Sequence, residues 1–246
     1  MAASSPTDPS TDPDGATALV TGAASGMGRA VAERFLAEGW TVLGMDRDAA
    51  TLDAAAAGLG PAFHPLPADV TDRTAVAAAL GAIERLRAVV NAAGVYPPTV
   101  LADYDEATYR RIFDVNVLGT LNVTAEAVPA LRAAGGGSVV NFASIDAFAV
   151  SAGQLLYSAS KAAVVSLTRS LAHELGADGI SVNAVAPGWV DTPGTRAGGR
   201  IEEAVAAIPM GRAARPAEIA DWVWKLTQGT YLTGETLVVS GGLTVR

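Results

Sequence analysis

The feature that most constrains the fold of this chain is a glycine-rich turn between a short apolar run and a helical pattern. The run at residues 18–20 (ALV) is typical of a buried strand, and it leads into residues 21–28 (TGAASGMG). Apolar residues at helical spacing follow, at Val31, Phe35 and Leu36. Glycines in such a turn let the backbone approach a pyrophosphate, whose charge the N-terminus of the following helix stabilises. This order predicts the nucleotide-binding start of a doubly wound α/β sheet.

Short apolar segments alternate with helical patterns along the rest of the chain. The later predicted strands cover residues 41–45, 62–66, 87–91, 138–142, 181–185 and 236–239, each bounded by Gly, Pro, Asp or Asn. The longest helical stretches cover about 105–133 and 154–177, and the link over 71–87 is compact. The alternation predicts one α/β domain with a parallel sheet of about seven strands, helices on both faces and right-handed crossovers.

Composition excludes several classes of function. With 25 acidic against 17 basic residues, the net charge is −8, which disfavours a nucleic-acid-binding face. The absence of cysteine excludes disulfides, thiol catalysis and thiolate metal sites. His64 and His173 are far apart in sequence and are interpreted as structural, so no metal is predicted.

The N-terminal segment and the lengths of the apolar runs indicate where in the cell the protein resides. Residues 1–14 are rich in Pro, Ser, Thr and Asp and are predicted to be a disordered tail, leaving 15–246 as the single domain. No basic residue precedes Arg29, and no run of 18 apolar residues occurs. The sequence therefore predicts a cytoplasmic protein with no membrane partner.

A tyrosine and a lysine stand four residues apart in the second long helical stretch. Tyr157 and Lys161 would lie on one helix face, where the lysine charge would favour the phenolate and lower the tyrosine pKa. Ser144, thirteen residues before Tyr157, offers a hydroxyl to hold a substrate oxygen. Such pairs are also common on solvated helices, so the spacing alone leaves both interpretations open.

The motifs together resemble those of the short-chain dehydrogenases/reductases, over about residues 15–246. The motifs are Gly22-x-x-x-Gly26-x-Gly28, Asn91-Ala92-Ala93-Gly94, Asn116, Ser144, Tyr157-x-x-x-Lys161 and Pro187-Gly188, in the order found in that family. The resemblance implies a Rossmann-type domain, a nicotinamide cofactor and a homotetramer or homodimer.

The resemblance also implies four catalytic residues. Tyr157 would exchange a proton with the substrate, and Lys161 would lower the Tyr157 pKa and bind the nicotinamide ribose. Ser144 would position the substrate oxygen. Asn116 would kink its helix and hold a water that links Lys161 to solvent.

The cofactor expected from these residues is NAD rather than NADP. Asp46 ends the second strand, where a carboxylate binds ribose hydroxyls and repels a 2′-phosphate. Arg47 could pair with that phosphate, but we expect it on the opposite face of a continuing strand. Asp69 would meet the adenine amino group by resemblance, or would only cap a helix. The predicted cofactor-binding residues are Gly22, Ser25, Gly26, Met27, Gly28, Asp46, Arg47, Asp69, Val70, Asn91, Ala92, Ala93, Gly94, Tyr157, Lys161, Pro187, Gly188, Val190 and Thr192.

The substrate is expected to be a moderately polar or cyclic secondary alcohol or ketone, oxidised or reduced with NAD(H). A Gly/Pro-rich segment over about 189–211, with a short helical piece at 201–207, would cover it by resemblance or would be an ordinary surface crossover. The candidate substrate residues are Val95, Tyr96, Ile145, Asp146, Val150, Gln154 and Trp189. The alternatives are a reductase of carrier-bound 3-oxoacyl chains, a non-catalytic NAD-binding sensor or scaffold, and a nucleotide-sugar epimerase.

Overall fold

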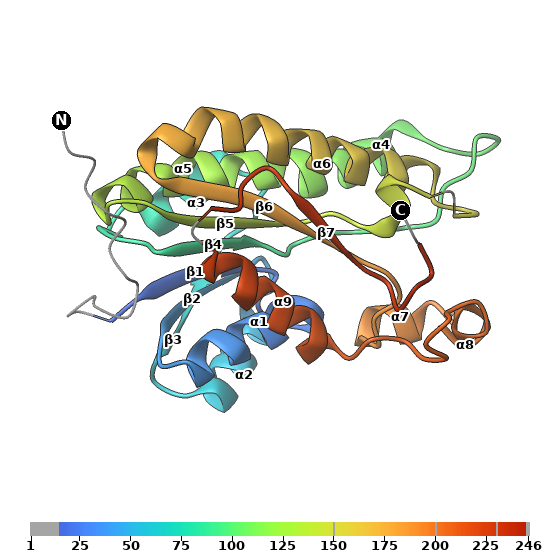
Figure 1. The fold of residues 1–246 in the computed structure, drawn as a ribbon, viewed down its shortest axis with the longest axis horizontal. Helices are drawn as coiled ribbons and strands as arrows, with labels where there is room; N and C mark the ends of the chain where they lie inside the picture. Colours follow the sequence, from blue (N-terminus) through green and yellow to red (C-terminus); the bar gives the residue numbers. More distant parts are fainter. Residues whose placement is uncertain (1–14, 150, 200, 230, 245–246) are drawn as a thin grey trace.

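The backbone of the chain forms a seven-stranded parallel sheet in the order β3-β2-β1-β4-β5-β6-β7 (Figure 1). The computed structural model describes residues 15–149, 151–199, 201–229 and 231–244. The strands are β1 (Thr17–Thr21), β2 (Thr41–Asp46), β3 (Phe63–Pro67), β4 (Ala88–Asn91), β5 (Gly137–Phe142), β6 (Ile180–Pro187) and β7 (Thr236–Val239). Every neighbouring pair is parallel. The predicted fold class is therefore confirmed.

Helices cover both faces of the sheet (Figure 1). One layer holds α1 (Gly26–Ala37), α2 (Ala49–Leu59) and α9 (Pro216–Gln228). The other holds α3 (Arg73–Leu80), α4 (Glu106–Phe113), α5 (Gly119–Ala133) and α6 (Leu155–Leu175). Two short helices, α7 (Pro193–Ala197) and α8 (Ile201–Val205), lie between β6 and α9.

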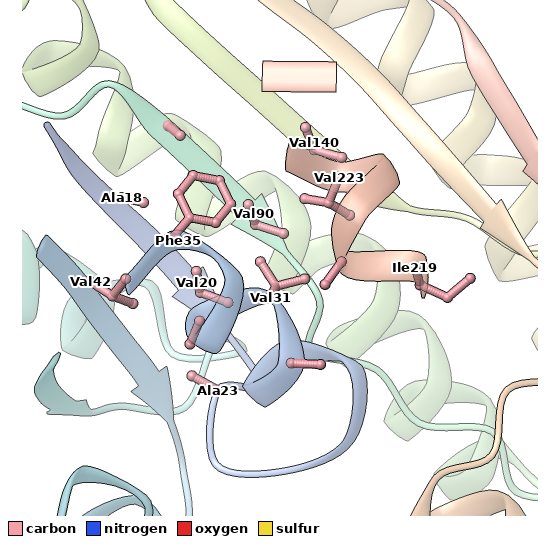
Figure 2. Packing of buried hydrophobic residues seen from close by; sticks show 14 of the residues in the cluster. Ala18, Val20, Ala23, Val31, Phe35, Val42, Val90, Val140, Ile219 and Val223 are labelled. Atoms are coloured by element: carbon pink, nitrogen blue, oxygen red, sulfur yellow. The ribbon is translucent and has the colours of Figure 1, made fainter. Parts of the chain in front are cut away.

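Alternate residues of each strand supply the two core layers. In β1, Val20 packs with Phe35 of α1 and Val223 of α9, as Figure 2 shows. Its neighbour Leu19 packs on the opposite face, against the layer that includes Val123 of α5. Both strand residues are fully buried, which explains why the run 18–20 carries no polar residue.

The chain order reverses between β1 and β4, since β1 pairs with β2 on one side and with β4 on the other. At such a reversal the connections leave in opposite directions, and a crevice opens beyond the carboxyl ends of the strands. The residues predicted for the cofactor follow these strand ends.

The long helical stretch predicted over 105–133 is interrupted. It consists of α4, a π-helical turn η2 (Asp114–Leu118) and α5. The predicted tail at 1–14 lies outside the described residues. None of the helices in the described part of the chain is both apolar and long enough to cross a membrane.

Candidate active site

Two adjoining cavities lie beyond the carboxyl ends of the strands. The first, of about 340 Å³, is lined by the glycine-rich turn, the ends of β2 and β3 and the segment after β4. The second, of about 200 Å³, is lined by residues after β5 and β6 and by the start of α6. Met27, Gly94, Tyr96 and Thr192 line both, so the cavities adjoin.

The glycine-rich turn leaves room for a phosphate group. Gly22 and Gly26 have φ values of +66° and +56°, a region that favours glycine. A Cβ on Gly28 would lie 2.2 Å from the Gly22 carbonyl oxygen, so only glycine permits this approach. Helix α1 begins at Gly26, where the first N–H groups of a helix have no partner within it. Because these residues line the first cavity, it fits the pyrophosphate of a dinucleotide.

Asp46 and Arg47 both line the first cavity. The Asp46 carboxylate accepts hydrogen bonds from the backbone N–H groups of Ala24 and Asp48, each at 3.2 Å. Strand β2 ends at Asp46, so the alternation of faces does not continue to Arg47. The expectation that the strand would direct Arg47 away from the cavity is therefore wrong, because it assumed a longer strand.

Asp69 and Val70 also line the first cavity. Asp69 accepts hydrogen bonds from the backbone N–H and the hydroxyl of Thr71, at 2.9 and 2.8 Å. The cap of α3 is Asp72, which accepts from the N–H groups of Thr74 and Ala75. The helix-cap interpretation thus belongs to Asp72.

Asn91 lies in the core, and the residues after it line the cavities. Its side-chain amide donates to Thr124 of α5 at 3.0 Å and to Asn141 of β5 at 2.9 Å. These hydrogen bonds connect β4 with helix α5 and with strand β5. Ala92 and Gly94 line both cavities, and Ala93 lines the first. Asn91 lines neither cavity, so its position does not support the predicted contact with the cofactor; its hydrogen bonds stabilise the sheet instead.

Ser144, Tyr157 and Lys161 come together in the second cavity. Ser144 follows β5 and precedes a 3₁₀ turn, η3 (Ile145–Ala147), while the other two lie on α6. Tyr157 is hydrogen-bonded to the Ser144 side chain. The Lys161 ammonium donates to the Phe142 carbonyl oxygen at 2.6 Å and lies 5.7 Å from the centroid of the Tyr157 ring.

Burial controls the pKa values of this pair. Burial raises the pKa of Tyr157; the Ser144 hydrogen bond opposes that rise, and the negative charge of Asp146 adds to it. Burial lowers the pKa of Lys161 to about 8. The pKa of Tyr157 is thus raised in this structure, not lowered as the sequence predicts, and burial is the largest cause.

Asn116 lies in the π-helical turn η2, where the sequence predicts a kink, and is 1 % exposed. Its side-chain amide donates to the Val95 carbonyl at 2.9 Å and to the Ser160 hydroxyl at 3.0 Å, while its oxygen accepts from the Val95 N–H at 2.9 Å. A Cβ placed on Gly94 would lie 3.3 Å from the Asn116 Oδ1 and 3.6 Å from the Lys161 Nζ. Asn116 thus fixes the segment after β4 against α6, beside Lys161.

Most of the predicted substrate residues line the cavities. Tyr96, Ile145, Asp146, Gln154 and Trp189 line the second, as do the predicted cofactor residues Pro187, Gly188 and Val190. Val95 lines the first. Val150 lies outside the described residues.

The structure adds lining residues that the sequence analysis missed. Ser151 lines the second cavity and donates a hydrogen bond to Asp146. Gly194 and Thr195, at the start of α7, line it as well, so the segment 189–211 contributes to its wall. The sequence pattern that could have predicted this helix start is Thr192-Pro193-Gly194-Thr195, in which the two threonine side chains cap the first turn of α7.

Comparisons with known proteins agree with this geometry. The family model described as enoyl-(acyl carrier protein) reductase matches residues 22–244. Galactitol 2-dehydrogenase (L-tagatose-forming) of Cereibacter sphaeroides is 40% identical over 244 residues, 94% of this chain and 96% of that protein. The 3-oxoacyl-[acyl-carrier-protein] reductase of Thermotoga maritima is 35% identical over 243 residues, covering 94% and 99%.

A solved structure of a short chain dehydrogenase/reductase family protein superposes with a TM-score of 0.88. Its sequence is 39% identical, and the match covers 94% of this chain and 98% of the other. The chain therefore belongs to the short-chain dehydrogenase/reductase family, oxidoreductases that bind a nicotinamide cofactor and act on alcohols or ketones.

Proposed function

We propose that this protein transfers a hydride between NAD(H) and a secondary alcohol or ketone, with a moderately polar or cyclic substrate. The observation that carries the proposal is the meeting of Ser144, Tyr157 and Lys161 in a cavity that adjoins the glycine-lined one. A cofactor held in the first cavity would present its reactive end to these side chains. The two reactants would meet at the residues that line both cavities, which are Met27, Ala92, Gly94, Tyr96, Thr192 and Gly194.

The preference for NAD follows from the charge at the end of β2. The Asp46 carboxylate accepts ribose hydroxyls and repels a 2′-phosphate. Its hydrogen bond from the Ala24 N–H holds it against the glycine-rich turn, whereas Arg47 is exposed. We therefore expect Asp46 to outweigh Arg47.

In this mechanism the protein binds both reactants and handles one proton. Bound NAD⁺ would accept the hydride that leaves the carbinol carbon. The Tyr157 oxygen would take the hydroxyl proton during oxidation and return it during reduction. The Ser144 hydroxyl would hold the substrate oxygen beside Tyr157, and the Lys161 ammonium would stabilise negative charge on the tyrosine oxygen.

The raised pKa of Tyr157 affects which direction of the reaction, oxidation or reduction, is favoured at neutral pH. A buried phenol keeps its proton at neutral pH, a state suited to donating that proton to a ketone oxygen. Alcohol oxidation needs the phenolate, so we expect the oxidation rate to rise with pH and the reduction rate to fall.

The test is the change in nicotinamide absorbance with purified protein, NAD⁺ or NADP⁺, and a panel of secondary alcohols, cyclic diols and polyols. Turnover with NAD⁺ that Tyr157→Phe abolishes is the expected result. Turnover with NADP⁺ alone would mean that Arg47 outweighs Asp46. The absence of turnover with both cofactors would favour a non-catalytic sensor or scaffold.

A second candidate is the reduction of carrier-bound 3-oxoacyl chains, which the Thermotoga maritima relative favours. Against it stands the net charge of −8, since a carrier protein of acidic surface would be repelled. A 3-oxoacyl thioester of pantetheine, compared with a free cyclic ketone, separates the two candidates. Preference for the thioester would reject the main proposal.

The assembly and location expected from the sequence belong to the same proposal. We expect a homotetramer or homodimer in the cytoplasm, without nucleic-acid or membrane partners. Light scattering coupled to size-exclusion chromatography measures the assembly, and a monomeric mass would reject that part.

A further inference from the structure

We infer that Asp146 selects the substrate class: neutral compounds with a second hydroxyl near the reacting carbinol carbon, as in polyols and cyclic diols, in preference to anionic substrates. This inference rests on the proposed function, because it concerns the substrate of the same site. It names the hydrogen-bond chemistry of that substrate, which the proposed function leaves open.

The position of Asp146 is fixed relative to Ser144. The two residues are separated by one position in the chain, and the Asp146 backbone N–H donates to the Ser144 hydroxyl oxygen at 3.1 Å. Both lie at the 3₁₀ turn that follows β5. Any substrate oxygen held by Ser144 would therefore have the Asp146 residue as an immediate neighbour.

The carboxylate of Asp146 is held in the wall of the second cavity. Asp146 is partly buried there, and the Ser151 hydroxyl donates a hydrogen bond to its Oδ1. A carboxylate has about four lone-pair positions and so accepts several donors at once, of which Ser151 is one. A hydroxyl of the substrate is such a donor.

The charges around the second cavity favour a neutral ligand. Among the described residues that line it, the charged side chains are Asp146 and Lys161. The Lys161 ammonium already donates to the Phe142 carbonyl. Arg196, at the end of α7, pairs with Asp191, so its charge is compensated there.

The negative charge of Asp146 is felt where the reaction would occur. It contributes to the raised pKa of Tyr157, which shows that its field reaches the phenol oxygen. An anionic substrate beside Tyr157 would be repelled by the same field. A hydroxyl would instead form a charge-assisted hydrogen bond, which is about twice as strong as one between neutral groups.

The experiment compares three substrates on the wild-type enzyme and on Asp146→Asn. The substrates are cyclohexane-1,2-diol, cyclohexanol, which lacks the second hydroxyl, and 3-hydroxybutyrate, which carries a negative charge. The substitution keeps the shape of the side chain and removes its charge. Asp103→Asn serves as the control, since Asp103 is exposed and belongs to neither cavity lining.

We expect the wild-type enzyme to prefer the diol to cyclohexanol by about tenfold or more in kcat/KM, and Asp146→Asn to lose about tenfold of that preference. The variant should also gain activity on 3-hydroxybutyrate, and its pH profile should shift to lower pH because a negative charge near Tyr157 is gone. Asp103→Asn should match the wild type in all three measurements.

The outcomes separate this inference from the proposed function. Equal use of the diol and cyclohexanol, with the same ratio in Asp146→Asn, would overturn the role of Asp146 and leave the proposed oxidoreductase standing. A parallel loss on both substrates would mean a structural role and would also overturn it. Absence of turnover by the wild type on any alcohol, with either cofactor, would reject the proposed function and this inference with it.

Discussion

Replacing Lys161 by methionine should abolish turnover and yet stabilise the fold near neutral pH. Lys161 is 5 % exposed, and burial lowers its pKa from the ordinary 10.5 to about 8. At about 1.4 kcal/mol per pKa unit, keeping that ammonium charged in the folded protein costs about 3.5 kcal/mol. Methionine retains the apolar stem and removes the charge. It also removes the hydrogen bond to the Phe142 carbonyl, worth about 1.5–3 kcal/mol, so the net gain at pH 7 is about 1 kcal/mol.

The pH dependence of the free energy of unfolding tests the argument more sharply than the stability at one pH. Between pH 8 and 10.5 the unfolded chain holds more protons on this lysine than the folded chain, so the free energy of unfolding rises with pH. The wild type should therefore gain roughly 2 kcal/mol from pH 7 to 10, and Lys161→Met should not gain it. The range ends at pH 10 because the raised pKa of Tyr157 acts in the opposite direction above that value.

The assay is thermal or urea unfolding at one protein concentration across this pH range, without cofactor. A gain of 1 kcal/mol in a chain of this size raises the Tm by about 2–4 °C. Lys225→Met is the matched control, since Lys225 is exposed and packs over the Trp222 ring. A flat wild-type profile, or the same slope in Lys161→Met, would refute the argument that burial depresses the lysine pKa.

Three further predictions concern the cavities. Gly28→Ala places a Cβ 2.2 Å from the Gly22 carbonyl oxygen. The cofactor affinity, measured by titration, should therefore fall at least tenfold, and the free energy of unfolding should fall by about 1–3 kcal/mol. An unchanged affinity would reject the role of the turn in binding the phosphates. Asp46→Ser should shift the NAD-to-NADP ratio of kcat/KM toward NADP by about tenfold, and an unchanged ratio would contradict the charge argument. Gly194→Ala places a Cβ 2.1 Å from the Tyr96 hydroxyl oxygen, so kcat/KM should fall about tenfold and Tyr96→Phe in the same chain should restore most of it. Additive losses in that double variant would mean that the clash is not the cause.

The sequence predicts the parts of this protein that depend on local pattern. The apolar runs predict the seven strands to within a few residues at each end. Strands buried on both faces, such as β4, consist mainly of apolar residues. The Tyr157–Lys161 spacing predicts their meeting on α6, because helix geometry fixes it.

What the sequence could not predict depends on contacts between distant segments. The pKa of Tyr157 depends on how completely the segments around it exclude water, and no spacing encodes that. The place of Arg47 depends on β2 ending at Asp46, one residue sooner than alternation assumes. Ser151 contacts Asp146 although five positions separate them, and no helix or strand periodicity encodes that contact.

The helix formed by α4, η2 and α5 contains a π-helical turn at Asn116, so the number of residues in it affects the site. Such a turn accommodates one residue more than an α-helical turn. Deleting a single residue beside Asn116 within 114–118 would let the helix close as a regular α-helix, with α4 and α5 in nearly their present rotation. The wide turn that directs the Asn116 side chain would then be gone. Asn116 would lose Val95 and Ser160 although every amino acid that contacts it is still encoded. For this helix a frame-preserving deletion is therefore more damaging to the site than to the fold, and a count of residues between α4 and α5 is as informative as their identities.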